Sequence, residues 1–147
     1  MDDIRRTIEM RAPIDRVWRH LTEPELLSRW LMPNTFRPVL GRAFTMDCPP
    51  GIGSGAPIEA RVTILEPPAG NRARLAYTWA IDEPPLTTLL DIRLTERGGT
   101  TRLDLVHSGW TLEPSDAGVR ERHAGGWDHL LENLLKPLVE VSGIRQS

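Results

Sequence analysis

Two histidines, His107 and His123, are the residues of this chain best suited to chemistry. A neutral imidazole both donates and accepts hydrogen bonds, and it can serve as a general acid, a general base or a metal ligand. His107 ends the segment "TRLDLVH" and His123 begins "HAGGWDHLLENLL", so two different elements carry them. The hydrophobic periodicity of both segments directs the two side chains toward one interior.

An imidazole in an apolar interior needs a partner, because an unpaired polar group there costs about 1–3 kcal/mol. Three interpretations fit: both histidines are hydrogen-bonded structural residues near a cavity rim, they orient a bound ligand, or they take part in catalysis or metal binding. No carboxylate or cysteine stands at metal-ligand spacing from either one, which favours the structural interpretation. We therefore assign no catalytic residue and expect no metal and no cofactor.

Three predicted hairpins build the sheet that carries His107. Their turns fall at Gly98–Gly99, near Ala80–Pro85 and at Pro67–Asn71. The predicted opposite pairs are Leu94–Leu103, Ile92–Leu105 and Leu90–His107; Trp79–Leu86, Tyr77–Thr88 and Leu75–Leu90; and Val62–Leu75, Ala60–Tyr77 and Ile58–Trp79. Because the apolar residues keep one parity throughout, the four strands form an antiparallel meander with one apolar face and one solvated face.

Further elements flank this meander. "IRRTIEMR" alternates like a first strand, with Arg6 as the exception, and "GRAFTMDC" is another strand whose pairing the pattern leaves open. "PIDRVWRHL" has the spacing of a buried helix, and Thr22 with Glu25 predicts a capping box that starts a second short helix. The last helix is predicted over Ser115–Val141, and its apolar stripe comprises Trp127, Leu130, Leu131, Leu134, Leu138 and Val141. His20 and His129 lie off the apolar stripes of their helices and are predicted to be solvated.

The last helix contains three poor helix formers. Gly125 and Gly126 each cost roughly 1 kcal/mol against alanine, and Pro137 would cost about 3 kcal/mol in a helix interior. We expect the two glycines to let the helix backbone approach the sheet or the loops closely while Trp127 anchors it. We expect Pro137 to bend the helix along the curved sheet.

These elements predict an α+β helix-grip fold. A curved antiparallel sheet of about six to seven strands wraps on a long C-terminal helix, and two short helices follow the first strand. The length of 147 residues suits one domain spanning 1–147. A net charge of −2 gives no basic surface for nucleic acid, and the single cysteine, Cys48, excludes an internal disulfide. No apolar run approaches the ~20 residues that cross a bilayer, so we expect no membrane insertion and a cytoplasmic location.

Ten residues are candidates for contact with a ligand, most of them because parity or helical phase directs them inward. They are Trp30, Tyr77, Trp79, Leu90, Ile92, Leu105, His107, His123, Trp127 and Leu130. Such a set of aromatic and aliphatic side chains with a few polar groups is typical of a small-molecule pocket.

Several short motifs carry a family resemblance. They are "AP" at 12–13, "VW" at 17–18, "LTEPELLSRW" at 21–30, "HSGW" at 107–110 and His123 followed by "GGW" at 125–127. Together they resemble the bacterial relatives of the C-terminal domain of the heat-shock-protein ATPase activator, within the START-like (SRPBCC) superfamily. The resemblance covers nearly the whole chain. It implies a helix-grip around a hydrophobic cavity, in a superfamily whose members bind lipids, hormones and polyketides and in some cases catalyse reactions on them.

Three functions remain open at this point. The first, which we expect, is non-catalytic binding of a small hydrophobic molecule between sheet and helix. The second is an enzyme acting on a hydrophobic substrate with His107, His123 or Tyr77 as acid or base. The third is a chaperone-associated, protein-binding domain, as the family resemblance implies. The sequence leaves the oligomeric state open.

Overall fold

The computed structural model describes residues 2–48 and 55–145, with side-chain surroundings up to residue 140. Most of the glycine-rich loop after Cys48, and the side chain of Val141, lie outside this description. The elements are β1 (Ile4–Met10), α1 (Ile14–Thr22), α2 (Pro24–Ser28), β2 (Ala43–Met46), β3 (Ile58–Ala69), β4 (Arg72–Asp82), β5 (Pro85–Arg97), β6 (Thr100–Ser108), the short 3-10 turn η1 (Pro114–Asp116), α3 (Ala117–His129), the π-helical turn η2 (Leu130–Leu135) and α4 (Lys136–Arg145).

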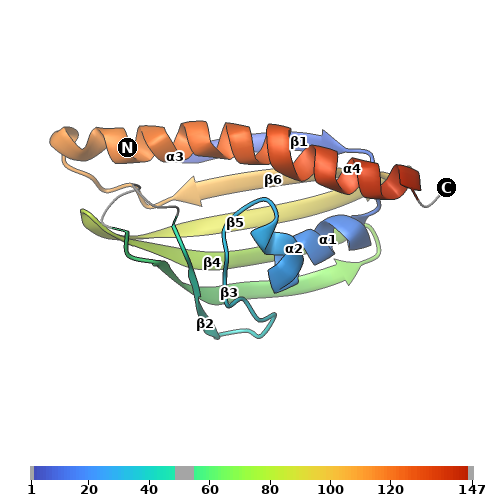
Figure 1. The fold of residues 1–147 in the computed structure, drawn as a ribbon, viewed down its shortest axis with the longest axis horizontal. Coiled ribbons are helices and arrows are strands. Elements are labelled where there is room, and N and C mark those ends of the chain that lie inside the picture. The colour runs from blue at the N-terminus through green and yellow to red at the C-terminus, as the bar shows by residue number, and fades with distance from the viewer. Residues whose placement is uncertain (1, 49–54, 146–147) are drawn as a thin grey trace.

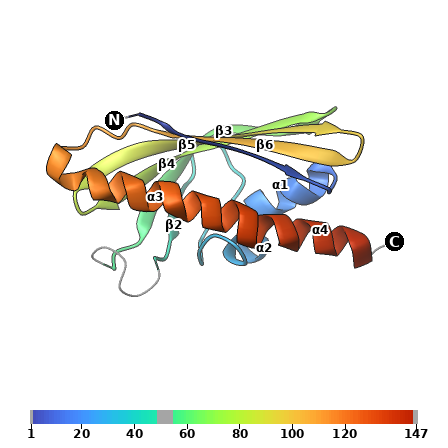
Figure 2. The same ribbon diagram turned by 90° about the horizontal axis from the view of Figure 1, so that it is seen from above.

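The described strands form one antiparallel sheet of six, in the order β1-β6-β5-β4-β3-β2. The terminal helix, from η1 to α4, crosses one face of this sheet, and α1 and α2 lie on the same side near the α4 end (Figures 1 and 2). This arrangement confirms the α+β helix-grip fold with two short helices after the first strand. No helix within the described ranges is long and apolar enough to cross a bilayer.

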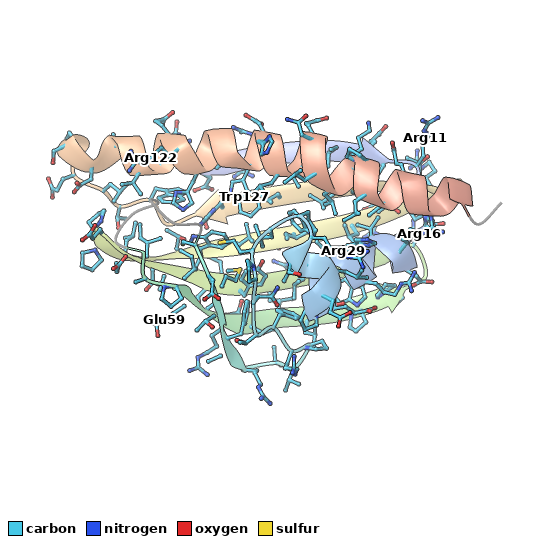
Figure 3. All side chains as sticks on the ribbon, in the orientation of Figure 1. Arg11, Arg16, Arg29, Glu59, Arg122 and Trp127 are labelled. Atoms are coloured by element: carbon cyan, nitrogen blue, oxygen red, sulfur yellow. The ribbon has the colours of Figure 1, made fainter. Side chains whose placement is uncertain are left out.

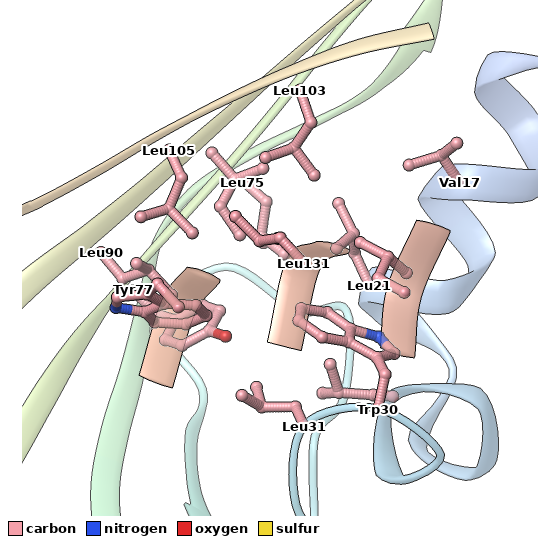
Figure 4. Packing of buried hydrophobic residues seen from close by; sticks show 14 of the residues in the cluster. Val17, Leu21, Trp30, Leu31, Leu75, Tyr77, Leu90, Leu103, Leu105 and Leu131 are labelled. Carbon is pink, nitrogen blue, oxygen red and sulfur yellow. The ribbon is translucent and has the colours of Figure 1, made fainter. Parts of the chain in front are cut away.

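The β5–β6 hairpin has the predicted register, with Leu94 opposite Leu103 and Leu90 opposite His107. Its turn residues Gly98 and Gly99 have φ of 59° and 81°, which suits a two-residue turn whose positive φ values glycine adopts at no steric cost. The side chains between sheet and helix form the core, part of which Figure 4 shows.

The registers predicted for the other two hairpins are wrong by two residues. Tyr77 lies opposite Leu90 instead of Thr88, because the β4–β5 turn is shorter than expected and Asp82 already pairs with Pro85. Tyr77 also lies opposite Val62 instead of Ala60, because β3 continues to Ala69 and contains two irregularities. A shift of two leaves every side chain on its predicted face, since the side-chain period of a strand is two.

The junction between α1 and α2 differs from the predicted capping box. Thr22 is the last residue of α1, and its hydroxyl donates to the carbonyl of Trp18 at 2.8 Å instead of capping α2. The prediction that His20 is solvated is also wrong: its side chain is 4% exposed, and Nδ1 lies 2.8 Å from the carbonyl oxygen of Arg16. Trp30 covers this region and donates its indole N–H to the backbone carbonyl of His20.

The terminal helix buries a stripe with a different phase from the predicted one. Trp127 and Leu131 are buried as expected, but Leu135 and Val139 continue the stripe, whereas Leu134 is 36% exposed. The cause is η2. A π-helical turn contains more residues per turn than an α-helical one, so residues four apart, such as Leu131 and Leu135, stay on the buried face. The π-helical turn ends directly before Lys136-Pro137, where proline lacks the N–H of a regular α-helical bond.

Arg6, the charged residue that breaks the alternation of apolar and polar residues in β1, joins this strand to the terminal helix. Its guanidinium donates to the carboxylate of Asp128 at 2.6 Å and to the backbone carbonyl of Ala124 at 3.2 Å. A charged residue on an inward-facing position is therefore satisfied because β1 lies at the sheet edge, next to α3.

The explanation predicted for the two glycines is wrong. A Cβ atom added at Gly125 or at Gly126 would meet no atom within 4 Å, so neither glycine permits a close approach to the sheet or the loops. Gly125 is exposed, whereas Gly126 is half-buried on the inner side of the helix.

Candidate functional site

A pocket of about 400 Å³ lies between α3, the start of β3 and the end of β4. The segments after α2 and after β2 complete its wall. Its lining is mostly apolar, with a few polar groups, and consists of Leu31, Met32, Cys48, Ala56, Ile58, Trp79, Ile81, Asp82, Glu83, Val119, Arg122, His123, Gly126, Trp127, His129 and Leu130. Figure 3 shows Trp127 between the terminal helix and the sheet and Arg122 nearer the N-terminal end of α3.

The pocket opens beside a second, more polar groove of about 420 Å³. The two share Asp82, Glu83, Val119 and Arg122, so one wall separates an apolar interior from a polar rim. The rim carries charges of both signs.

Four of the ten sequence-predicted ligand residues line the pocket: Trp79, His123, Trp127 and Leu130. The other six lie in the packed core outside this lining; they are Trp30, Tyr77, Leu90, Ile92, Leu105 and His107. The alternation of side chains along each strand predicts the correct face of the sheet, but the pocket occupies only one end of that face. Tyr77, for example, is covered by the ring of Phe44 at 5.0 Å, and burial raises the pKa of its phenol.

His107 is at the centre of a hydrogen-bonded chain that joins helix and sheet. The indole N–H of Trp127 donates to Nδ1 of His107 at 3.0 Å, and Nε2 lies 2.7 Å from the hydroxyl of Thr88. Because an indole only donates, Nδ1 accepts and the ring proton of the neutral imidazole is on Nε2. Nε2–H therefore donates to Thr88, whose own hydroxyl donates to the backbone carbonyl of Trp79 at 2.8 Å.

This series of hydrogen bonds gives His107 a structural role. Its side chain is fully buried, and burial, with a smaller contribution from His123, lowers its pKa to about 3. The ring is thus neutral near neutral pH, and both nitrogens already have protein partners. An imidazole in this state can neither take a proton from a substrate nor bind a metal without breaking the bond that holds Trp127.

His123 differs from His107 in that, among the described residues, one of its ring nitrogens has no protein partner. Its Nδ1 lies 2.8 Å from the backbone carbonyl oxygen of Val119, one helical turn earlier. Since a carbonyl only accepts, Nδ1 carries the ring proton and Nε2 presents a lone pair. Burial, together with the nearby charge of Arg122, lowers the pKa of His123 despite the opposing bond to Val119. His123 therefore brings a neutral hydrogen-bond acceptor to the pocket lining.

Trp110 belongs to the same cluster, although its sequence parity is opposite to that of His107. Gly109 has a φ of 93°, a value that favours glycine, and this turn brings Trp110 back to the inner face. The indole is 1% exposed and donates to the backbone carbonyl of His107 at 3.0 Å. Its ring centroid is 4.9 Å from that of His123, so Trp110 holds the His123 ring in place.

Sequence reasoning missed the residues that close the pocket. Val119 and Arg122 lie four and one positions before His123, and helical spacing from His123 would have found Val119. Leu31, Met32 and Cys48 come from irregular segments, where no periodicity indicates which side chains turn inward. Among the residues that the structure describes, no group of three or more histidine, cysteine, aspartate or glutamate side chains is placed to hold a metal ion.

Comparisons with known proteins agree with the fold. The family model for "Activator of Hsp90 ATPase homolog 1-like protein" matches residues 11–140. Protein MLL2253 from Mesorhizobium loti is a similar structure, with a TM-score of 0.79, 26% identity, and coverage of 93% of this chain and 96% of that one. Protein BH1534 from Bacillus halodurans has a TM-score of 0.76, 30% identity, and coverage of 95% and 98%, respectively.

The Aha1 dimer from Colwellia psychrerythraea, a solution structure, has a TM-score of 0.73 at 20% identity and covers 96% of this chain and 98% of its own. At this identity the likeness concerns the fold. No curated protein sequence matches the chain.

Proposed function

The chain belongs to the family of activator of Hsp90 ATPase homolog 1-like proteins, and we propose that it binds a small, largely apolar molecule in the pocket between α3 and the ends of β3 and β4, without catalysing a reaction on it. The observation that supports this proposal is the pocket itself. Its volume of about 400 Å³ and its apolar lining with a few polar groups are typical of small-molecule sites.

The state of the potential reactive groups supports binding over catalysis. Both nitrogens of His107 are bonded within the protein. Cys48 is the thiol in the lining, and burial, followed by the charges of Asp82 and Asp47, raises its pKa and so disfavours the nucleophilic thiolate. His123 contributes a neutral acceptor to the lining, a role that orients a ligand without transferring a proton.

A chaperone-associated, protein-binding role is the second candidate, and the family match supports it. It is tested by mixing the chain with a purified Hsp90-class chaperone and measuring complex formation by analytical ultracentrifugation. Binding at micromolar concentrations would support this role, and its absence would leave the pocket as the site of function.

The proposal that a ligand binds in the pocket is tested with a substitution in the terminal helix that fills the pocket. Gly126 lines the pocket, and nothing lies within 4 Å of a Cβ added there, so Gly126→Leu places a side chain in the space that a ligand would occupy. Gly125→Leu is the matched control, because Gly125 is exposed and outside the lining while both changes raise helix propensity.

Binding is measured with the neutral, apolar fluorophore N-phenylnaphthylamine. We expect enhanced fluorescence with the parent chain and with Gly125→Leu, and loss of at least about tenfold in affinity with Gly126→Leu. Equal binding by both variants would show that the probe binds elsewhere and would contradict the proposal. Native mass spectrometry of protein purified from its source would identify a resident molecule.

A further inference from the structure

We infer that the ligand of this pocket carries a hydroxyl group that donates a hydrogen bond to Nε2 of His123. This inference rests on the proposed function, since it names a chemical feature of the molecule bound in the same pocket. It follows from the tautomer of His123, from the rigid surroundings of its ring and from the rim and the apolar lining of the pocket.

The tautomer is set by the helix backbone. Val119 lies one turn before His123, and its carbonyl oxygen is 2.8 Å from Nδ1. This contact requires the ring proton on Nδ1, because a carbonyl oxygen has no proton to give. Within the part of the chain that the structure describes, Nε2 has no hydrogen-bond partner in the protein. The pocket therefore contains a fixed acceptor that only a donor can satisfy.

Aromatic side chains hold the ring of His123 in this orientation. Its centroid is 4.9 Å from Trp110, 5.8 Å from His107 and 6.0 Å from Trp79. Trp110 and His107 are themselves fixed by hydrogen bonds. A ligand therefore meets an acceptor that is already oriented, and little side-chain entropy is lost when the bond forms.

The rim and the apolar lining favour a neutral donor. Arg122 and the carboxylates Asp82 and Glu83 place both signs of charge at the rim, so these residues select neither a cationic nor an anionic ligand. A carboxylate would in addition have no proton to give to Nε2 at neutral pH. A phenol or an alcohol has the required proton without a charge that the apolar lining would desolvate.

The test compares β-naphthol with its methyl ether, which has the same ring system but no proton to donate. Occupancy is read from how far each compound slows the alkylation of Cys48 by N-ethylmaleimide, because Cys48 lines the pocket and is the single cysteine of the chain. The reaction is run at mildly alkaline pH, where a thiol with a raised pKa still has a reactive thiolate fraction. The variants are His123→Phe and His123→Leu, neither of which can accept a hydrogen bond. Retained binding of the ether, together with an unchanged melting temperature, shows that a variant is folded.

We expect the preference for β-naphthol over its ether to fall by about five- to tenfold in both variants, while the affinity for the ether changes little. A preference that is the same in the parent and the variants would overturn the inference and leave the proposed function intact. Failure of both compounds to protect Cys48 in the parent would overturn the inference and the proposed function together.

A measurement on the parent chain gives an independent readout. The nitrogen-15 resonance of His123 Nε2 is expected to move upfield when β-naphthol is added and to stay in place with the ether, because only the former donates to its lone pair. No shift with bound β-naphthol would refute the predicted bond directly.

Discussion

The buried imidazole of His107 makes the stability of the protein depend on pH, and His107→Gln isolates this dependence. His107 is fully buried between Thr88 and Trp127, and burial lowers its pKa to about 3 from the ordinary histidine value of 6.5. Glutamine offers an N–H and a carbonyl of similar reach but does not titrate. The variant therefore removes the proton linkage while keeping both donor and acceptor.

The sign follows from where protons bind. Between pH 6.5 and pH 3 the unfolded chain holds a proton on His107 that the folded chain does not, so the free energy of unfolding falls as the pH falls. With these two pKa values the loss at pH 5 relative to pH 8 is about 2 kcal/mol. Burial lowers the pKa values of His20 and His123 as well, and their contributions have the same sign in both proteins and cancel in the comparison.

Urea unfolding of the parent and of His107→Gln at pH 8 and at pH 5 measures the effect. The variant is expected to be less stable at pH 8 but to lose about 2 kcal/mol less than the parent on acidification. Parallel pH dependences of the two proteins would refute the assignment of His107 as a neutral, buried link. A steeper loss in the variant would do the same.

Two further changes test the packing of the terminal helix, both by thermal melting and urea unfolding. Gly125→Ala is expected to stabilise the protein by about 0.5–1 kcal/mol, because the added methyl meets no atom within 4 Å and alanine favours the helix; a destabilised variant would show that this glycine has a structural role. Leu135→Ala is expected to cost about 2–5 kcal/mol, and its neighbour Leu134→Ala less than about 1 kcal/mol, because Leu135 is fully buried and Leu134 is 36% exposed. Equal costs at the two positions would contradict the helix phase set by η2.

The sheet was predictable because its apolar residues keep one parity. Leu75, Tyr77 and Trp79 lie on the buried face despite a register error of two, since alternation depends on the strand period and not on the partner. Where two glycines define the turn, as at Gly98–Gly99, the register was also correct. Where prolines or irregularities define it, local sequence allowed several turn lengths.

The helix and the site were less predictable because both depend on distant contacts. Periodicity assumed a regular α-helix, whereas η2 rotates the buried stripe from Leu134 to Leu135. Both His107 and His123 reach the interior as expected, but the sequence left their roles open. Their roles differ because Trp127 and Thr88 occupy both nitrogens of His107, whereas no described residue is bonded to Nε2 of His123.

By itself, the sequence determined the family, the order of the elements and which face of the meander strands is buried, because these depend on local periodicity and short motifs. Only the tertiary structure decided which end of the interior forms a pocket and which imidazole has a nitrogen without a partner among the described residues. A pocket is the space left when separate segments have packed, and a hydrogen bond depends on distances across those segments. Neither quantity is encoded in the neighbours of a residue along the chain.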